Sequence, residues 1–293
     1  FNNVVNDCEY GISLINNNYG YNFSNNSFTN CVYGVYLTGR IYNNNFSDNI
    51  FENGTYGVYV YAPYSATTPA SENNTFTNII IFNYTTDIYT NTSLLTPNYF
   101  INGTFNNSSI QTDENSSIIV KWYLDTLVND INGLPIQNAN VTSYNVFGSV
   151  DDTDLTSSNG QAQSEIIEFV QNSSGKLYYT NHTINASISG FSNTTEINIS
   201  DTNSTNITLS IATSNANCSI INGDTTFISD LSVNGSCIVV NASNLVISGN
   251  GATITGNNTG VGINITDFYN ITIIGLNLEN FSTAITLINS SNN

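Results

Sequence analysis

Positive charge is almost missing from this chain of 293 residues. Lysine and arginine together number 3 against 21 acidic residues, and the formal net charge is −18. Three cations cannot neutralise a run of phosphates, so we expect no nucleic-acid partner and no anionic membrane surface as partner. No apolar stretch approaches the roughly 18 residues of a membrane-spanning helix, so we also expect no membrane insertion.

Low charge does not make this a disordered chain. Only 8% of residues are charged, but 40% are hydrophobic and 12% are aromatic, which favours a packed core. The length suits two ordinary domains or one elongated repeat array. The sequence starts at Phe1 with no basic-then-apolar leader, so we expect a mature or excised piece of a secreted protein.

Asparagine is the most informative residue that is present. The chain has 54 Asn, 34 Ser and 35 Thr, and Asn-x-Ser/Thr occurs 27 times, whereas random order would give about 13. The excess predicts N-linked glycans on an exported protein. The alternative is that asparagine-rich turns precede threonine-rich strands. The predicted glycosylation sites are Asn22, Asn45, Asn53, Asn73, Asn83, Asn91, Asn102, Asn115, Asn140, Asn172, Asn185, Asn193, Asn198, Asn206, Asn234, Asn241, Asn257, Asn264, Asn270 and Asn280.

The first third of the sequence repeats itself. The phrase Cys8–Leu14 returns at Cys31–Leu37 and again at Gly54–Val60, each time after 23 residues. A second phrase, Phe28-Thr29-Asn30, returns at Phe51-Glu52-Asn53 and, after a short insertion around Pro63 to Pro69, at Phe76-Thr77-Asn78. Several phrases that keep one period are a strong sign of a repeat architecture.

The repeat predicts a right-handed parallel β-helix, because short alternating strands are interrupted by asparagine and glycine corners. Each coil would lie about 4.8 Å from the next, so equivalent side chains would stack in columns. The expected interior columns are Ile12 with Val35 and Val58, and Phe28 with Phe51 and Phe76. The expected corner ladders are Asn26 with Asn49, and Asn30 with Asn53.

The four cysteines indicate an oxidising, extracellular or cell-surface location. Four cysteines allow three pairings, and the repeat selects one of them. Cys8 and Cys31 share a column on successive coils, with Cα atoms about 5 Å apart. We therefore predict the disulfides Cys8–Cys31 and Cys218–Cys237. The alternative is a pair of stacked buried thiols.

A second coiled segment begins near residue 213. The phrase Asn244–Gly249 resembles Asn270–Gly275, and Phe281–Leu287 resembles Cys8–Leu14. These repeats resemble the periplasmic copper-processing (NosD-like) family of β-helix proteins, a scaffold of archaeal surface proteins, over residues 1–112 and 213–293. The resemblance implies a parallel β-helix. A copper role does not carry over, since the chain has no Met and only one His.

The period disappears in residues 113–212, where about seven short strands at sandwich-like spacing are predicted. This segment resembles the immunoglobulin-like carboxypeptidase-regulatory and invasin-type modules of surface proteins, with Trp122 as its expected core aromatic. The fold class is therefore all-β, with β-helix segments flanking an immunoglobulin-like sandwich.

Three features of the middle segment suggest chemistry. Asp151, Asp152 and Asp154 predict either a structural Ca²⁺ site or a solvated acidic turn, and we expect no other cofactor. We expect His182 on an exposed strand. The third feature is Lys121, which could form a covalent crosslink between its side chain and that of Asn206.

The order of the segments, with two coiled ends that match each other, predicts a non-enzymatic structural protein. It would be a subunit or repeat unit of an extracellular, glycosylated filament, sheath or surface layer, and copies of itself would associate head to tail. The alternatives are an adhesin that binds carbohydrate or cells through tyrosines such as Tyr56 and Tyr59, and a β-helix polysaccharide lyase or hydrolase. The enzyme is disfavoured, because Arg40 is the only arginine and the acids form no recognisable triplet.

Overall fold

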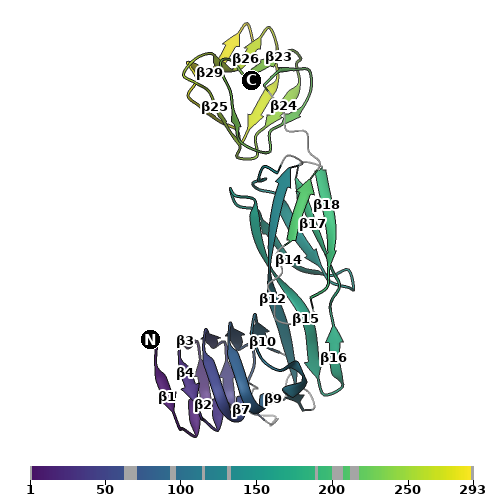
Figure 1. Cartoon of the computed structure of the whole chain (residues 1–293). Helices are drawn as coiled ribbons and strands as arrows, with labels where there is room; N and C mark the ends of the chain where they lie inside the picture. The colour runs from purple at the N-terminus through teal and green to yellow at the C-terminus, as the bar shows by residue number, and fades with distance from the viewer. Residues whose placement is uncertain are drawn as a thin grey trace.

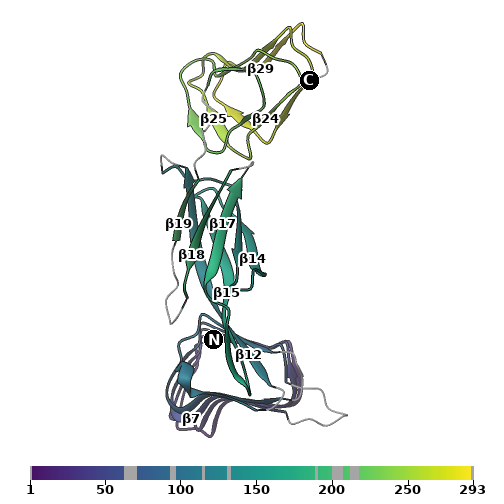
Figure 2. The ribbon, with the colours of Figure 1, turned by 90° about the vertical axis from the view of Figure 1, so that its right-hand side faces the viewer.

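The computed structural model describes residues 2–62, 71–92, 97–113, 116–130, 133–188, 191–199, 207–211 and 218–291. Within these residues the protein is all-β apart from a single 3-10 turn, and two coiled segments are separated by a module of two sheets (Figures 1 and 2). We call the coiled segments the first and the second solenoid. No helix in the described part of the chain is both long and apolar enough to cross a membrane.

The first solenoid winds through three parallel faces per coil, and its coils superimpose when they are viewed along the axis (Figure 2). Its elements are β1 (Val4–Asn6), β2 (Tyr10–Tyr19), β3 (Asn22–Ser24), β4 (Ser27–Thr29), β5 (Tyr33–Tyr42), β6 (Asn45–Ser47), β7 (Ile50–Ala62), β8 (Thr75–Thr77), β9 (Ile80–Thr92), β10 (Asn98–Ile101), η1 (Asn107–Ser109) and β11 (Ile110–Thr112).

The aliphatic column inside this solenoid is confirmed. Ile12 pairs in register with Val35, Val35 with Val58, and Val58 with Ile88. These side chains are between 0% and 7% exposed. The repeat therefore places one apolar side chain per coil at a fixed angular position, as a parallel β-helix requires.

The predicted aromatic column is partly wrong. Phe28 does stack on Phe51, but Phe76 stacks on Phe46 and on Phe100, with ring centroids 4.7 Å apart in both pairs. The cause is that similar Phe-containing phrases occur on two faces of the first two coils, in the columns of Phe23–Phe46 and Phe28–Phe51. The additional residues between β7 and β8 made the phrase at Phe76 look like a copy of the wrong face.

The predicted asparagine ladders are confirmed. Asn26 donates from Nδ2 to Asn49 Oδ1 at 2.9 Å, and Asn53 Nδ2 donates to Asn30 Oδ1 at 3.2 Å. The described residues include nineteen non-glycine residues with positive φ, of which sixteen are asparagine and three are aspartate. Asparagine tolerates this left-handed conformation and its amide bonds along the stack, which explains its abundance at the corners.

The module is joined to the first solenoid without a break. Its strands are β12 (Ser117–Asp130), β13 (Asn140–Tyr144), β14 (Val150–Leu155), β15 (Gln161–Asn172), β16 (Gly175–Tyr178), β17 (His182–Ile188), β18 (Phe191–Ile197) and β19 (Ile207–Ile211). The start of β12 pairs with β10 on one side, while β15 pairs with β12 from Ser117 to Leu127 and β19 pairs with the end of β12. Ile118 and Val120 consequently belong to the core of the first solenoid, whereas Trp122 and Leu124 belong to that of the module.

Across from β12 and β15, a second sheet in the order β14-β13-β17-β18 completes the module. Trp122 is 3% exposed in the shared core, as predicted, and its indole Nε1 donates to Glu168 Oε2 at 2.7 Å. A buried indole needs such a partner because an unpaired N–H is costly.

The second solenoid has three parallel sheets, which hold β20-β23-β26-β29, β21-β24-β27 and β22-β25-β28. The strands are β20 (Ile220–Ile221), β21 (Thr225–Thr226), β22 (Leu231–Ser232), β23 (Ile238–Val240), β24 (Leu245–Ser248), β25 (Thr253–Thr255), β26 (Val261–Thr266), β27 (Ile271–Ile274), β28 (Asn277–Glu279) and β29 (Thr283–Ile288).

Both predicted disulfides are confirmed. Cys8 is bonded to Cys31, with 4.4 Å between their Cα atoms, and Cys218 to Cys237, with 4.3 Å. Each bond ties the first coil of a solenoid to the next coil.

Candidate assembly surface

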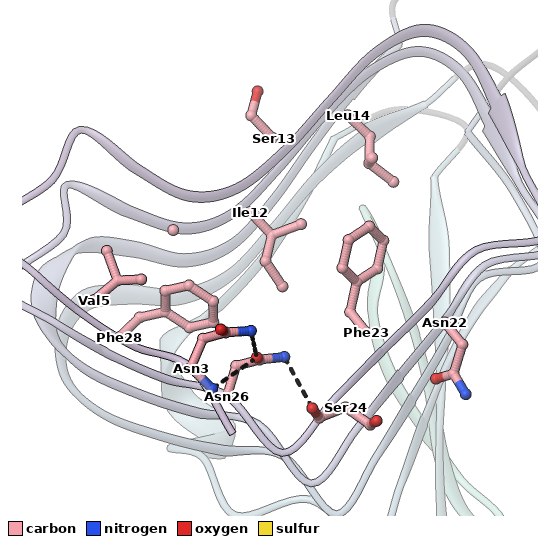
Figure 3. Close-up of a pocket in the computed structure, with 11 residues that line it drawn as sticks. Asn3, Val5, Ile12, Ser13, Leu14, Asn22, Phe23, Ser24, Asn26 and Phe28 are labelled. Atoms are coloured by element: carbon pink, nitrogen blue, oxygen red, sulfur yellow. Dashed lines mark hydrogen bonds between the residues drawn. The ribbon is translucent and has the colours of Figure 1, made fainter. Parts of the chain in front are cut away.

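The first coil of the first solenoid is open at its outer end. A hollow of about 520 Å³ lies there, and Val5, Ile12, Leu14, Phe23 and Phe28 point into it (Figure 3). The other side chains in Figure 3 include Ser13, which points away from the hollow. A solenoid that exposes its core and its strand edges in this way offers a template for another strand layer.

The opposite end of the same solenoid is covered. The hairpin of β15 and β16 lies across it, and Phe169 of β15 is fully buried in the core of the solenoid. Gln171 Nε2 donates to the carbonyl of Ile110 at 3.0 Å, and Lys176 Nζ donates to the carbonyl of Asn107 at 2.7 Å. The module therefore caps the inner end of the first solenoid, a role that the sequence analysis missed because the capping residues lie outside the repeat.

The last coil of the second solenoid is open like the first coil of the first one. Ile285 and Leu287 of β29 continue the inward columns of Ile263 and Ile265. The two residues on β26 are completely buried, whereas Ile285 is 42% exposed and Leu287 is 54% exposed. Side chains with inward orientation are thus left uncovered on this face.

The two open coils have the same local geometry. In the second solenoid β28 leads through Asn280, at φ 55°, into β29, and in the first solenoid β1 leads through Asp7, at φ 54°, into β2. Each open coil therefore presents a short strand, a left-handed corner and a longer strand in that order.

The inner end of the second solenoid contacts the module. Ile228 is 2% exposed and is part of the core of the module. Asn138 of the module donates from Nδ2 to the carbonyl of Asn250 at 2.6 Å. Both inner ends consequently have partners within the chain.

The predicted glycosylation sites lie at accessible positions wherever the structure describes them. Asn115 and Asn206 fall outside the described residues, and none of the other eighteen is buried. Several are also corner residues: Asn83 Nδ2 donates to Asn53 Oδ1 at 3.2 Å, and Asn102 Nδ2 donates to Asn78 Oδ1 at 2.8 Å. The ladder hydrogen bonds give these asparagines a structural role that does not depend on glycans. Glycosylation of these sites stays a prediction.

The acidic cluster of β14 does not form the predicted Ca²⁺ site. Its carboxylates accept hydrogen bonds from backbone N–H groups of β15. Asp151 Oδ2 accepts from Ile167 at 3.0 Å, Asp152 Oδ2 from Glu165 at 2.8 Å, and Asp154 Oδ2 from Gln163 at 3.2 Å. Within the described ranges, no three His, Cys, Asp or Glu side chains come together as metal ligands. The carboxylates instead satisfy the free edge of β15.

The expectation of an exposed His182 is wrong. Its side chain is fully buried, and Nε2 lies 3.0 Å from Asp151 Oδ2. Burial tends to raise the pKa of Asp151, but the hydrogen bonds from His182, Ile167 and Asn145 outweigh it and lower that pKa below its ordinary value. His182 lies on the core-facing side of β17, and the sequon around it concealed this.

The proposed crosslink cannot be followed to its partner, since Asn206 lies outside the described residues. Lys121 Nζ lies 3.2 Å from Glu165 Oε2, and both side chains are partly exposed.

Partly exposed tyrosines form two stacked columns on the outer face of the first solenoid. Tyr33 stacks on Tyr56 with ring centroids 5.4 Å apart, and Tyr59 stacks on Tyr89 at 4.8 Å. Burial between neighbours raises the pKa of Tyr59 to about 12. Because the ring faces cover one another, they are not free as platforms for sugar rings.

Three charged residues of the first solenoid contact other side chains of the coil. Asp7 accepts a corner hydrogen bond from Asn30, and Asp48 accepts one from Asn78, both at 3.0 Å. The guanidinium of Arg40 lies 4.6 Å from the ring centroid of Tyr42.

Comparisons with known proteins add no relative: no protein family, no curated protein and no solved structure matches this chain. The class that the fold itself defines is an all-β protein with β-solenoid architecture.

Proposed function

We propose that this protein is a non-enzymatic structural subunit or repeat unit of an extracellular, glycosylated filament, sheath or surface layer. Copies associate head to tail, and the last coil of one copy stacks on the first coil of the next. The observation that carries the proposal is the state of the four solenoid ends. The module covers the inner end of the first solenoid and contacts that of the second, whereas both outer ends leave inward-facing apolar side chains open.

The two open ends are different surfaces, so the contact between copies is heterologous. A heterologous contact that does not close into a ring produces an open, polar array. Capping of the inner end of the first solenoid disfavours competing associations there, because a covered solenoid end cannot template another strand.

The same proposal includes the fold types of the module and of the two solenoids. The module is immunoglobulin-like, which is supported by its two facing sheets and by the parallel pairing of its first and last strands, β12 and β19. The solenoids are of the NosD-like type, which is supported by their 23- and 26-residue phrases. In this protein they serve as scaffold.

The extracellular location is supported by two disulfides, which persist in oxidising compartments. N-linked glycans would add to the amide-rich surface and keep an assembly of low charge hydrated. Mass spectrometry of the native protein before and after enzymatic removal of N-glycans tests this part, and an unchanged mass would contradict it.

Electron microscopy and sedimentation of a Leu287→Asp variant test the assembly. We expect end-to-end arrays from the wild type and single particles from the variant, because a carboxylate in the stacked core is strongly unfavourable. Leu177→Asp on β16 is the matched control, since Leu177 is 53% exposed and Leu287 is 54% exposed. Equal assembly of both variants would overturn the proposal.

A further inference from the structure

We infer that Asn3 sets the direction of the contact between copies, because its side-chain oxygen accepts the backbone N–H of Leu276 from a second copy. This inference rests on the proposed head-to-tail assembly. It assigns a hydrogen-bond acceptor to one open end and the matching donor to the other, so that two identical ends do not pair.

The interior asparagine ladders of the first solenoid have a direction. Asn26 Oδ1 accepts from the backbone N–H of Asn3 at 3.3 Å and from its Nδ2 at 2.8 Å (Figure 3). Asn49 Oδ1 accepts from the same two groups of Asn26 at 3.0 and 2.9 Å. On another face, Asn74 Oδ1 accepts from the two groups of Asn44 at 3.1 and 3.0 Å. The side-chain oxygen in each pair is thus directed toward the preceding coil.

Asn3 is the first asparagine of its ladder. Its Nδ2 donates to Asn26, so its Oδ1, on the other side of the amide group, is directed out of the open end. No group in the described part of the chain donates to this oxygen. Asn26 and Asn49 are buried, whereas Asn3 is exposed. The open end of the first solenoid therefore presents an unused acceptor.

The donor in the preceding coil does not have to be an asparagine side chain. The second ladder begins at Asn44, and the residue before it in the stack is Tyr21. The backbone N–H of Tyr21 donates to Asn44 Oδ1 at 3.0 Å. A backbone N–H from a second copy is consequently sufficient to pair with Asn3 Oδ1.

Leu276 presents such an N–H at the other open end. Asn26 follows the left-handed residue Asn25, at φ 57°, and precedes β4. Leu276 follows Gly275, at φ 60°, and precedes β28. Leu276 therefore has the same place in its coil as Asn26, whose backbone N–H donates to the following coil.

The first backbone hydrogen bond of each strand supports this equivalence. Ser27 of β4 donates to the carbonyl of Asn3 at 2.8 Å, and Asn277 of β28 donates to the carbonyl of Ala252 at 2.9 Å. Both bonds run to the preceding coil. The Leu276 N–H is accordingly directed toward a following coil, and the described residues contain no acceptor for it.

The donor and the acceptor meet only when unlike ends stack. In the register in which the corners at Asn280 and Asp7 coincide, the Leu276 N–H of one copy faces Asn3 Oδ1 of the next. Two first coils would place two acceptors together, and two last coils would place two donors together. Either arrangement leaves buried polar groups unpaired, which is unfavourable. The contact therefore joins a last coil to a first coil.

Asn3→Ala removes the acceptor and keeps the backbone N–H that donates to Asn26. We expect the dissociation constant of the contact to rise about tenfold, because the Leu276 N–H is then buried without a partner. Sedimentation at several concentrations measures this constant, and thermal melting verifies that the variant is folded. Asn17→Ala is the matched control at an exposed position of β2 in the same coil, and it should leave the constant unchanged.

Cysteine crosslinking tests the direction. Asn6 and Glu279 are exposed and immediately precede the two corners that coincide. In the proposed register they are neighbours on successive coils, as Cys8 and Cys31 are. Mild oxidation of a mixture of Asn6→Cys and Glu279→Cys molecules should give mixed dimers. Neither variant alone should crosslink.

The outcomes separate the two proposals. Mixed dimers together with weaker assembly of Asn3→Ala support the inference. If the wild type assembles but Asn3→Ala is equally tight, or if no crosslink forms, the inference fails and the proposed function stands. If Asn6→Cys alone crosslinks as readily as the mixture, or if the wild type does not assemble, both fail.

Discussion

The two ends of the first solenoid differ in whether the last coil is covered by another part of the chain. Each end has a coil with inward-facing apolar side chains. At the inner end the hairpin of β15 and β16 places Phe169 over the core. At the outer end the core lies open in a hollow of about 520 Å³. The inner end is therefore covered by an element that lies outside the repeat.

The largest expected effect comes from removing the cap. Phe169→Ala should lower the free energy of unfolding by about 3–5 kcal/mol, since a fully buried aromatic ring is lost from the end of a core. Urea denaturation measures it. Leu177→Ala on the same hairpin is the control, with an expected change within about 0.5 kcal/mol. Similar values for the two variants would show that the hairpin is not a cap.

The open end depends on its disulfide. Replacing Cys8 and Cys31 by serine should cost about 3 kcal/mol, because the bond closes a loop whose ends are 23 residues apart. The first coil has a neighbouring coil on one side only, so we expect hydrogen exchange to accelerate in β1 and β2 before it does in β8. Uniform acceleration along the solenoid would contradict this local role.

The interior asparagine ladders should matter more than the exposed corners. Asn74 is fully buried, and its amide both donates to Asn98 and accepts from Asn44. Asn74→Ala should therefore cost about 2–3 kcal/mol, since it strands buried polar groups. Asn45→Ala on the exposed face should change the free energy of unfolding little. Equal losses, measured by urea denaturation, would mean that burial does not distinguish the ladders.

The smallest expected effect is on the free energy of unfolding at acidic pH. The pKa of Asp151 is lowered in the folded protein, so its contribution to stability is complete above the ordinary value of 3.8 and is lost as the pH falls through the folded value. Asp151→Asn should flatten the loss of stability in that range. Denaturation at several pH values measures this, and identical curves for the variant and the wild type would contradict it.

The sequence predicted the features that depend on the repeat. One period placed Ile12, Val35 and Val58 in a column and paired Cys8 with Cys31, because side chains at equal intervals return to the same position on a parallel coil. It failed for Phe76, where two faces of the coil use the same phrase.

The module was less predictable than the coils, since its contacts join residues far apart in the sequence. Nothing local indicated that the Asp151 carboxylate would accept from β15, that His182 would be buried, or that Phe169 would enter the first solenoid. The open ends were expected from the order of the segments. How far their apolar side chains are exposed could be learned only from the structure, because it depends on which strands lie beside them.

Hydrogen exchange at increasing protein concentration tests the central claim most directly. If copies stack through their open coils, protection should rise with concentration in β1, β2, β28 and β29 and stay constant in the β15–β16 hairpin. Protection that is independent of concentration in all four strands would contradict head-to-tail stacking.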